Sequence, residues 1–277
     1  MIRPATEDPP WAKTILIGSA VVILSLFLFL PLLALFAEAF RKGYAVFWMA
    51  IREDVALHAI FLTVLTALVC VPLNAVCGVA AAWAITKFRF PGRQFLLALI
   101  DLPFAISPVI AGLVWILLFG RQGWFGPWLE EHDIKIIFAF PGILLATMLV
   151  TFPFVARELI PLMESQGNDQ EEAAVTLGAG GWQIFRRVTL PNIKWGLLYG
   201  VLLCNARAMG EFGAVSVVSG HIRGQTNTLP LHVEVLYNEY QFSAAFACAS
   251  LLALLALVTL FLKVQLEQRH QSKRLRH

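Results

Sequence analysis

The chain contains six apolar runs that are each long enough to cross a lipid bilayer as a helix. A membrane-spanning helix needs about 20 consecutive apolar residues, because the hydrocarbon core is about 30 Å thick and a helix rises about 1.5 Å per residue. The runs cover residues 14–37, 58–85, 94–119, 136–156, 194–218 and 243–264. The sequence therefore predicts an all-α membrane protein with six transmembrane helices.

The composition supports the same class of protein. Of the 277 residues, 58% are hydrophobic and 14% are charged, whereas about 25% are charged in an ordinary soluble domain. A soluble domain could not bury so much apolar surface, so the lipid bilayer is the expected surrounding. The net charge of +3 gives no reason to expect nucleic acid. The first run exceeds the roughly 7–15 apolar residues of a cleaved signal peptide, so we expect it to be retained.

The distribution of lysine and arginine predicts that both termini lie in the cytoplasm. With the N-terminus inside, fourteen of these residues fall in cytoplasmic segments, including Arg157 directly after the fourth run. Six fall in outer segments, and Arg207 lies within the fifth run. An excess of positive residues marks the cytoplasmic side. This orientation places the polar stretch 168–191, between the fourth and fifth runs, in the cytoplasm.

The stretch 168–191, called the elbow below, predicts two short helices joined by a turn. Asp169 is expected to cap the first helix, with Glu172 completing a pair of the capping-box type. Gly178 is expected to end this helix, as glycine does in the C′ position. Its apolar face would consist of Ala173, Ala174 and Leu177.

The second half of the elbow completes a pattern found in one protein family. Gly180 and Gly181 permit a sharp turn, and residues 182–189 can form the second helix. The spacing resembles the "EAA" loop of bacterial ABC-importer permeases, with Val188 where that family usually has isoleucine. The residues that carry the resemblance are Glu172, Ala173, Ala174, Gly178, Leu190 and Pro191.

No compact catalytic or metal-binding set is visible in the sequence. The chain has no Gly-x-x-x-x-Gly-Lys-Ser/Thr loop to cradle nucleotide phosphates, no Gly-x-Ser-x-Gly motif of a serine nucleophile and no His-Glu-x-x-His metal-binding motif. The four cysteines lack Cys-x-x-Cys spacing and are expected to pack between helices. The six histidines are expected in loops or at interfaces. We therefore expect that this chain is not an enzyme and binds no metal or cofactor of its own.

Charges inside the apolar runs are few, and each one suggests a role. An arginine at the centre of a membrane helix costs about 2.5–3.5 kcal/mol, which makes Arg207 a functional candidate. Glu211 lies four residues later, where it can pair with Arg207 on one helix face. The pair would either line a translocation path or form a structural ion pair between helices. The candidate path residues are Arg207, Glu211, Gly210, Gly213 and Ser107.

Other polar residues in or beside the runs have structural explanations. Asp101 is expected to cap or bond exposed backbone rather than contact a substrate, because its carboxylate would repel an anion. Asn74 and Asn205 are expected to bridge helices. Residues 219–230 would face outside, either as a solvated loop or as a contact for a partner that delivers substrate.

Three further segments are similar to permeases for tetrahedral oxyanions, and among these to the sulfate/thiosulfate family. They are residues 101–112, 207–215 and 220–231. The resemblance implies the fold of a type I ABC importer permease. It divides the chain into an N-terminal tail, first transmembrane helix and outer loop (1–57), a permease core (58–265) and a basic cytoplasmic tail (266–277).

The resemblance also implies a function, the ATP-driven import of sulfate or thiosulfate across the bacterial inner membrane. It implies a second, homologous permease subunit, a dimer of ATPase subunits that hold ATP and Mg, and an extracytoplasmic sulfate- or thiosulfate-binding protein. In such permeases the elbow docks a short helix into a groove of the ATPase. Glu172 and Gly178 would then be coupling residues, Glu172 by holding the start of the helix and Gly178 by letting the backbone turn.

Alternatives to this function remain open at the level of sequence. Molybdate or another tetrahedral oxyanion is an alternative substrate, because no residue visibly measures the size of the anion. An ATP-independent channel or secondary transporter would be favoured by a chain of titratable groups across the membrane, and Arg207 with Glu211 is the single pair of this kind. A membrane-embedded enzyme lacks a catalytic set.

Overall fold

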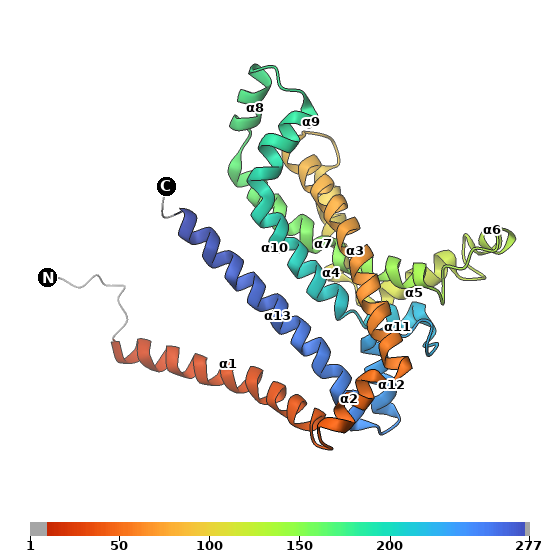
Figure 1. The fold of residues 1–277 in the computed structure, drawn as a ribbon. Coiled ribbons are helices and arrows are strands. Elements are labelled where there is room, and N and C mark those ends of the chain that lie inside the picture. The colour runs from red at the N-terminus through yellow and green to blue at the C-terminus, as the bar shows by residue number, and fades with distance from the viewer. Residues whose placement is uncertain (1–9, 275–277) are drawn as a thin grey trace.

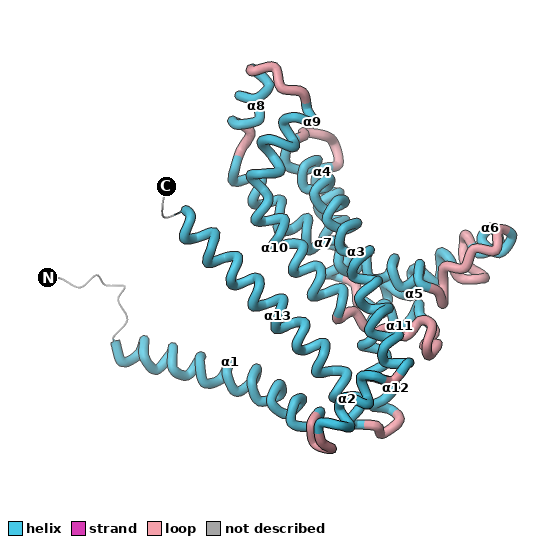
Figure 2. The backbone as a smooth tube through the Cα atoms, viewed as in Figure 1, coloured by secondary structure: helices cyan, strands magenta, loops and turns pink. Residues whose placement is uncertain are grey.

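The computed structural model describes residues 10–274, which form helices joined by short loops (Figure 2). The helices in chain order are α1 (Pro10–Ala39), α2 (Tyr44–Arg52), α3 (Asp54–Lys87), α4 (Arg93–Ala105), α5 (Pro108–Phe119), α6 (Gly126–Glu131), α7 (Phe140–Gln166), α8 (Asp169–Thr176), α9 (Gly181–Ile184), the π-helical turn η1 (Phe185–Thr189), α10 (Leu190–Met209), α11 (Gly213–Ser219), α12 (Leu229–Asn238) and α13 (Phe242–Arg274). The predicted all-α class is confirmed.

Six spans are present if each broken span is counted once. By length and composition, α1, α3, α7 and α13 could each cross a membrane as a single helix. Two bent pairs pass the same test together: α4 with α5, bent by 110°, and the helix Gly181–Met209 with α11, bent by 51°. The third and fifth predicted spans are therefore broken helices. Such breaks are tolerated in membranes where the freed backbone groups are buried in protein or line a cavity.

The fourth span extends beyond its predicted end. α7 continues to Gln166, whereas the apolar run ends at residue 156. The prediction stopped where Arg157 introduces a charge, but Arg157 lies inside the helix and pairs with Asp101 of α4 (Nε to Oδ1, 3.3 Å). The pairing replaces the backbone-capping role expected for Asp101. Arg157 is therefore a paired residue within α7 and not a cation in the loop that follows this helix.

Three helices meet closely at the centre of the protein. Val155 of α7 is 0% exposed, and α3 and α10 each place a glycine against it. A Cβ atom at Gly78 would lie 2.7 Å from Val155 Cβ, and one at Gly200 would lie 3.1 Å from Val155 Cα. Small residues let membrane helices approach in this way. The contact fixes α3, α7 and α10 as one packed unit.

Asn74 joins α3 to α7, as predicted. Its Nδ2 donates to Thr151 Oγ1 at 2.8 Å and to the carbonyl of Met148 at 3.2 Å. Asn205 instead donates to Met209 Sδ (3.6 Å) within α10, so its predicted bridge between helices is wrong.

We expect Asn74→Leu to lower the unfolding free energy by about 1 kcal/mol, because an interhelical hydrogen bond in a membrane contributes about 0.6 and at most about 1.7 kcal/mol. Thermal unfolding of the detergent-purified protein measures the loss. Asn205→Leu is the matched control, and an equal loss in both variants would contradict the bridging role of Asn74.

The two ends of the helical unit are both built from short helices. α8 and α9 lie at one end of α7 and α10, and α2 and α12 lie at the opposite end (Figure 1). α1 diverges from α13, and its apolar window is 0% buried within the chain. The apolar surface of α1 is thus free to face lipid or another subunit.

The end that carries α12 is more tightly packed than the sequence suggests. Thr226, Asn227 and Thr228 are at most 4% exposed, and the backbone N–H of Leu229 donates to Thr63 Oγ1 of α3 at 2.7 Å. A solvated loop is therefore wrong for this half of residues 219–230. His232 in α12 is 3% exposed and lies in neither a loop nor an exposed interface. Its burial lowers the pKa of its imidazole.

Candidate functional site

The elbow projects from the end of the bundle where α7 finishes and α10 begins (Figure 1). Its first helix is α8, as predicted. Its second helix is not separate, because α9 continues through η1 into α10. Pro191 explains the local π geometry: its ring would collide with the carbonyl four residues earlier in a regular α-helix. The wider turn of η1, in which the N–H of Leu190 bonds to Phe185 O, lies directly before this proline.

Gly178 ends α8 as predicted. It has φ of +82°, a left-handed conformation that glycine adopts without steric cost. Its N–H donates to the carbonyl of Val175 at 2.9 Å, and the N–H of Ala179 donates to that of Ala174 at 3.0 Å. These two bonds form a Schellman motif, which satisfies the last carbonyls of the helix. The backbone turn at Gly178 is therefore stabilised by hydrogen bonds within the elbow.

The start of α8 differs from the prediction. Asn168 occupies the N-cap position without a side-chain capping bond, and Asp169 is the first helical residue. The predicted capping pair of Asp169 and Glu172 is wrong. Acidic residues in the first turn still interact favourably with the positive end of the helix dipole. Glu172 itself is exposed.

The outer surface of the elbow carries unpacked apolar side chains. α8 contains no buried residue, and its predicted apolar face does not pack against this chain. Leu177 is 87% exposed, Trp182 71% and Val175 59%. Exposed apolar groups clustered on one small element mark an interaction surface. Leu190, in contrast, packs against the core cluster of α3, α7 and α10, where it roots the elbow.

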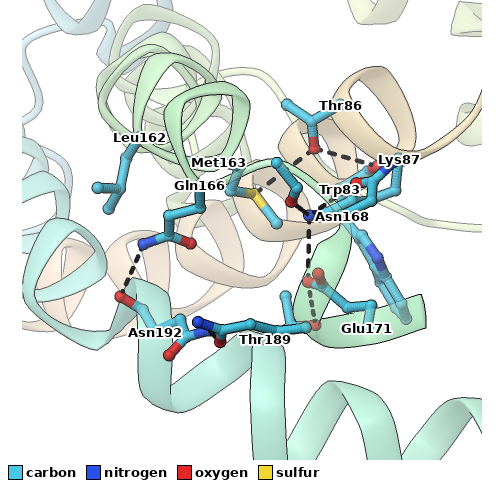
Figure 3. A network of polar contacts seen from close by, with 12 residues as sticks. Trp83, Thr86, Lys87, Leu162, Met163, Gln166, Asn168, Glu171, Thr189 and Asn192 are labelled. Carbon is cyan, nitrogen blue, oxygen red and sulfur yellow. Dashed lines mark hydrogen bonds and ion pairs between the residues drawn. The ribbon is translucent and has the colours of Figure 1, made fainter. Parts of the chain in front are cut away.

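Lys87, the last residue of α3, ties the elbow to the bundle (Figure 3). Its Nζ donates to the carbonyl of Gly167 at 2.6 Å and to Asn168 Oδ1 at 3.0 Å. It also pairs with Glu171 Oε1 at 3.1 Å. The same Glu171 oxygen accepts a hydrogen bond from Thr189 Oγ1 of η1 at 3.2 Å. No local pattern in the sequence indicates this role, because Lys87 follows the apolar run 58–85 as an ordinary polar flank and Glu171 is one of several acidic residues at the start of α8.

A second set of contacts joins the two arms of the elbow to each other, the first arm being the end of α7 with α8 and the second being η1 with the start of α10. Asn192 Nδ2 donates to Gln170 Oε1 at 2.6 Å, and Gln166 Nε2 donates to the carbonyl of Asn192 at 3.2 Å. Trp83 of α3 stacks on Phe185 of η1, with ring centroids 4.9 Å apart. The elbow is therefore bonded to α3, α7 and α10 together.

The two broken spans cross each other near their breaks. A Cβ atom at Gly213 would lie 2.9 Å from Pro108 Cβ, and one at Gly112 would lie 2.7 Å from the carbonyl of Ala214. These contacts place the starts of α5 and α11 side by side. Ser107 is the exposed N-cap residue of α5 and directly precedes Pro108, which contacts Gly213.

Arg207 and Glu211 pair as predicted, but in a different setting. Glu211 lies in the break after α10, so the two do not share one helix face. Glu211 Oε2 is 2.9 Å from the Arg207 guanidinium, and the side chains are 1% and 36% exposed. Glu211 Oε1 accepts the N–H of Ala214 at 2.9 Å, which caps α11. Arg207 occupies the last turn of α10, where a cation interacts favourably with the helix dipole.

Gly210 ends α10 and lines a cavity of about 280 Å³ between α10 and α13, together with Ala206 and Met209. Within residues 10–274, no group of three His, Cys, Asp or Glu side chains is arranged to hold a metal ion. The candidate site therefore consists of two parts, the elbow with its exposed apolar side chains at one end and the Arg207–Glu211 pair beside the crossing of the broken spans.

Comparisons with known proteins identify the fold and the family. Residues 74–272 match the family model described as "Binding-protein-dependent transport system inner membrane component". A sulfate transport system permease protein CysW of Escherichia coli (strain K12) is 53% identical over 95% of this chain and 91% of that protein. The permease protein CysT of the same organism is 39% identical over 90% of both chains. In a crystal structure of a bacterial alginate ABC transporter, one chain superposes with a TM-score of 0.76 at 19% identity, covering 94% of both chains.

Proposed function

Because the chain belongs to the family of binding-protein-dependent transport system inner membrane components, we propose that it is the membrane-spanning subunit of an ATP-driven sulfate/thiosulfate importer. The observation that supports sulfate as the substrate is the 53% identity to a sulfate permease along nearly the whole chain. Residues 58–265 form the permease core in this proposal. The chain supplies the path and the coupling surface, and it catalyses no reaction itself.

Separate ATPase subunits drive the transport, and they hold the ATP and Mg. The elbow is their docking surface, since Leu177, Val175 and Trp182 expose apolar side chains that a groove in a partner could cover. Of the coupling motif itself, Glu172, Ala173, Gly178 and Pro191 are exposed. The elbow then lies in the cytoplasm, and both termini lie on the same side of the inner membrane. An extracytoplasmic sulfate- or thiosulfate-binding protein delivers the anion at the opposite face.

The second permease subunit is a homologous chain of the CysT type. The 39% identity of this chain to CysT of Escherichia coli supports a second subunit of that homologous type. The apolar window of α1 is unburied, and it provides surface for lipid and for that partner. The anion path runs past the crossing of the broken spans, with Ser107 and Gly213 at the starts of α5 and α11 and the Arg207–Glu211 pair directly before α11.

Uptake of labelled sulfate tests this function directly. In cells that express the permease pair, the ATPase and the binding protein, we expect ATP-dependent uptake that falls at least tenfold when this chain is omitted. Thiosulfate should compete with sulfate, and molybdate should compete weakly. Stronger inhibition by molybdate than by thiosulfate would assign the chain to another oxyanion. Uptake that persists without the ATPase would instead indicate a channel or secondary transporter.

A further inference from the structure

We propose that Lys87 and Glu171 form a clamp through which movement of the elbow is transmitted to α3. The inference rests on the proposed function, because it assumes that an ATPase moves the elbow. α7 and α10 flank the elbow in the chain and must follow it. α3 is separated from it in sequence by α4, α5, α6 and α7, so it follows only through side-chain contacts. The strongest polar contacts of this kind converge on Lys87.

The ammonium group of Lys87 contacts three groups at the junction of α7 and the elbow. Its Nζ donates hydrogen bonds to Gly167 O at 2.6 Å and to Asn168 Oδ1 at 3.0 Å, and it forms an ion pair with Glu171 Oε1 at 3.1 Å. Gly167 ends α7, while Asn168 and Glu171 belong to the start of α8. One charge on α3 therefore holds the junction of α7 and α8 from three directions.

Glu171 extends the clamp to the other arm of the elbow. Its Oε1 also accepts the hydroxyl of Thr189, which lies in η1 and is 2% exposed. Lys87, Glu171 and Thr189 thus form a line from α3 through α8 to the root of α10 (Figure 3). A displacement of α8 relative to α3 would break the ion pair of Lys87 and Glu171, and a displacement of α8 relative to η1 would break the hydrogen bond from Thr189.

Burial makes the clamp more rigid than an ordinary surface ion pair. The side chains of Lys87 and Glu171 are 9% and 19% exposed, whereas the neighbouring pair Arg93 and Glu164 is 36% and 48% exposed. Exposed pairs contribute little because water and salt screen them. The buried geometry resists separation, so α3 moves with the elbow rather than slipping past it.

α3 can carry this movement to the far end of the protein. It is a continuous helix of 34 residues, which corresponds to a length of about 50 Å at about 1.5 Å per residue. Asn74 links its middle to α7 through Thr151. Thr63 links its other half to α12 by accepting the N–H of Leu229. Lys87 and Glu171 are positioning residues in this scheme, since neither touches the anion.

The test compares Lys87→Met with the wild-type chain in the purified, reconstituted four-component complex. Three quantities are measured: co-purification of the ATPase subunit, ATP hydrolysis, and sulfate transported per ATP. We expect the variant to keep the ATPase and to hydrolyse ATP, while the amount of sulfate transported per ATP falls at least tenfold. Arg89→Met is the matched control, because Arg89 is an exposed cation two residues further on. It should transport normally.

Two additional variants separate transmission from folding. Glu171→Gln keeps an oxygen for Thr189 but removes the charge that Lys87 meets, and it should show the same loss per ATP. Lys87→Cys treated with 2-bromoethylamine regains an ammonium group of nearly native length, and transport should recover. The exposed Cys77 is first replaced by serine so that it does not react.

The outcomes that overturn the clamp differ from those that overturn the proposed function. An unchanged ratio of sulfate to ATP in Lys87→Met, or loss of the ATPase subunit from the complex, would overturn transmission through Lys87. Failure of the alkylated Lys87→Cys variant to recover would do the same. A wild-type complex without ATP-driven sulfate uptake would overturn the proposed function, and the clamp with it.

Discussion

Gly178→Trp is expected to detach the ATPase subunit and to abolish ATP-driven uptake, with a loss of at least a hundredfold in the initial rate. Gly178 has φ of +82°, and a left-handed conformation costs a residue with a side chain about 1–2 kcal/mol. Nothing lies within 4 Å of the position of its missing Cβ in this chain. The indole would therefore extend from the exposed surface of the elbow into the space that a groove of the proposed ATPase partner would occupy. The measurement is uptake of labelled sulfate together with the amount of ATPase that co-purifies.

A matched glycine distinguishes docking from backbone strain. Gly43, before α2, has φ of +94° and also has nothing within 4 Å of its missing Cβ. It is the N-cap residue of α2, and α2 lies at the end of the protein opposite α8 and α9 (Figure 1). Gly43→Trp should impose a similar strain but leave the ATPase attached. Gly178→Asn should retain most of the activity, because asparagine tolerates the left-handed conformation. Normal transport by Gly178→Trp would remove the elbow from the coupling mechanism.

The spans and the end of α8 could be predicted because their signals are local. Apolar length alone identifies a membrane helix, and Gly178 stops α8 because glycine suits one backbone conformation. The sharp break between α4 and α5 could not be read in the same way. Pro108 signals a bend, but an angle of 110° depends on how α5 packs against α11. That contact joins residues about one hundred positions apart, and no local rule describes it.

The clamp of Lys87 and Glu171 was missed for a related reason. Their separation of 84 positions has no periodicity, and each residue has an ordinary explanation at its own place in the chain. Lys87 matches the polar end of a span, and Glu171 matches an acidic first turn. Arg157 shows the opposite error, because a charge was taken as the end of a helix. Asp101 neutralises it from another helix. In both cases the role of the charged residue is determined by a partner far away in the sequence, which only the folded structure brings close.

Arg207→Met is the second substitution with a large expected effect, on stability as well as transport. It would leave the carboxylate of Glu211, which is 1% exposed, without its cation. Removing one partner of a buried ion pair costs about 3–5 kcal/mol, and the partial exposure of Arg207 favours the lower limit. Glu211→Gln should cost less, because its amide oxygen can still accept the N–H of Ala214 and cap α11. Thermal unfolding of the purified complex measures both changes.

The double variant Arg207→Met/Glu211→Gln decides between the two roles of the pair. It contains no unpaired charge, so we expect stability to return to within about 1 kcal/mol of the wild type, as for other ion pairs replaced by neutral groups. If the pair lines the proposed anion path, we expect sulfate uptake to remain at least tenfold lower, because the double variant removes the guanidinium of Arg207, whose side chain is 36% exposed. Recovery of both stability and uptake would instead assign the pair a structural role. The anion would then be held through other groups, of which Ser107 at the start of α5 is one candidate.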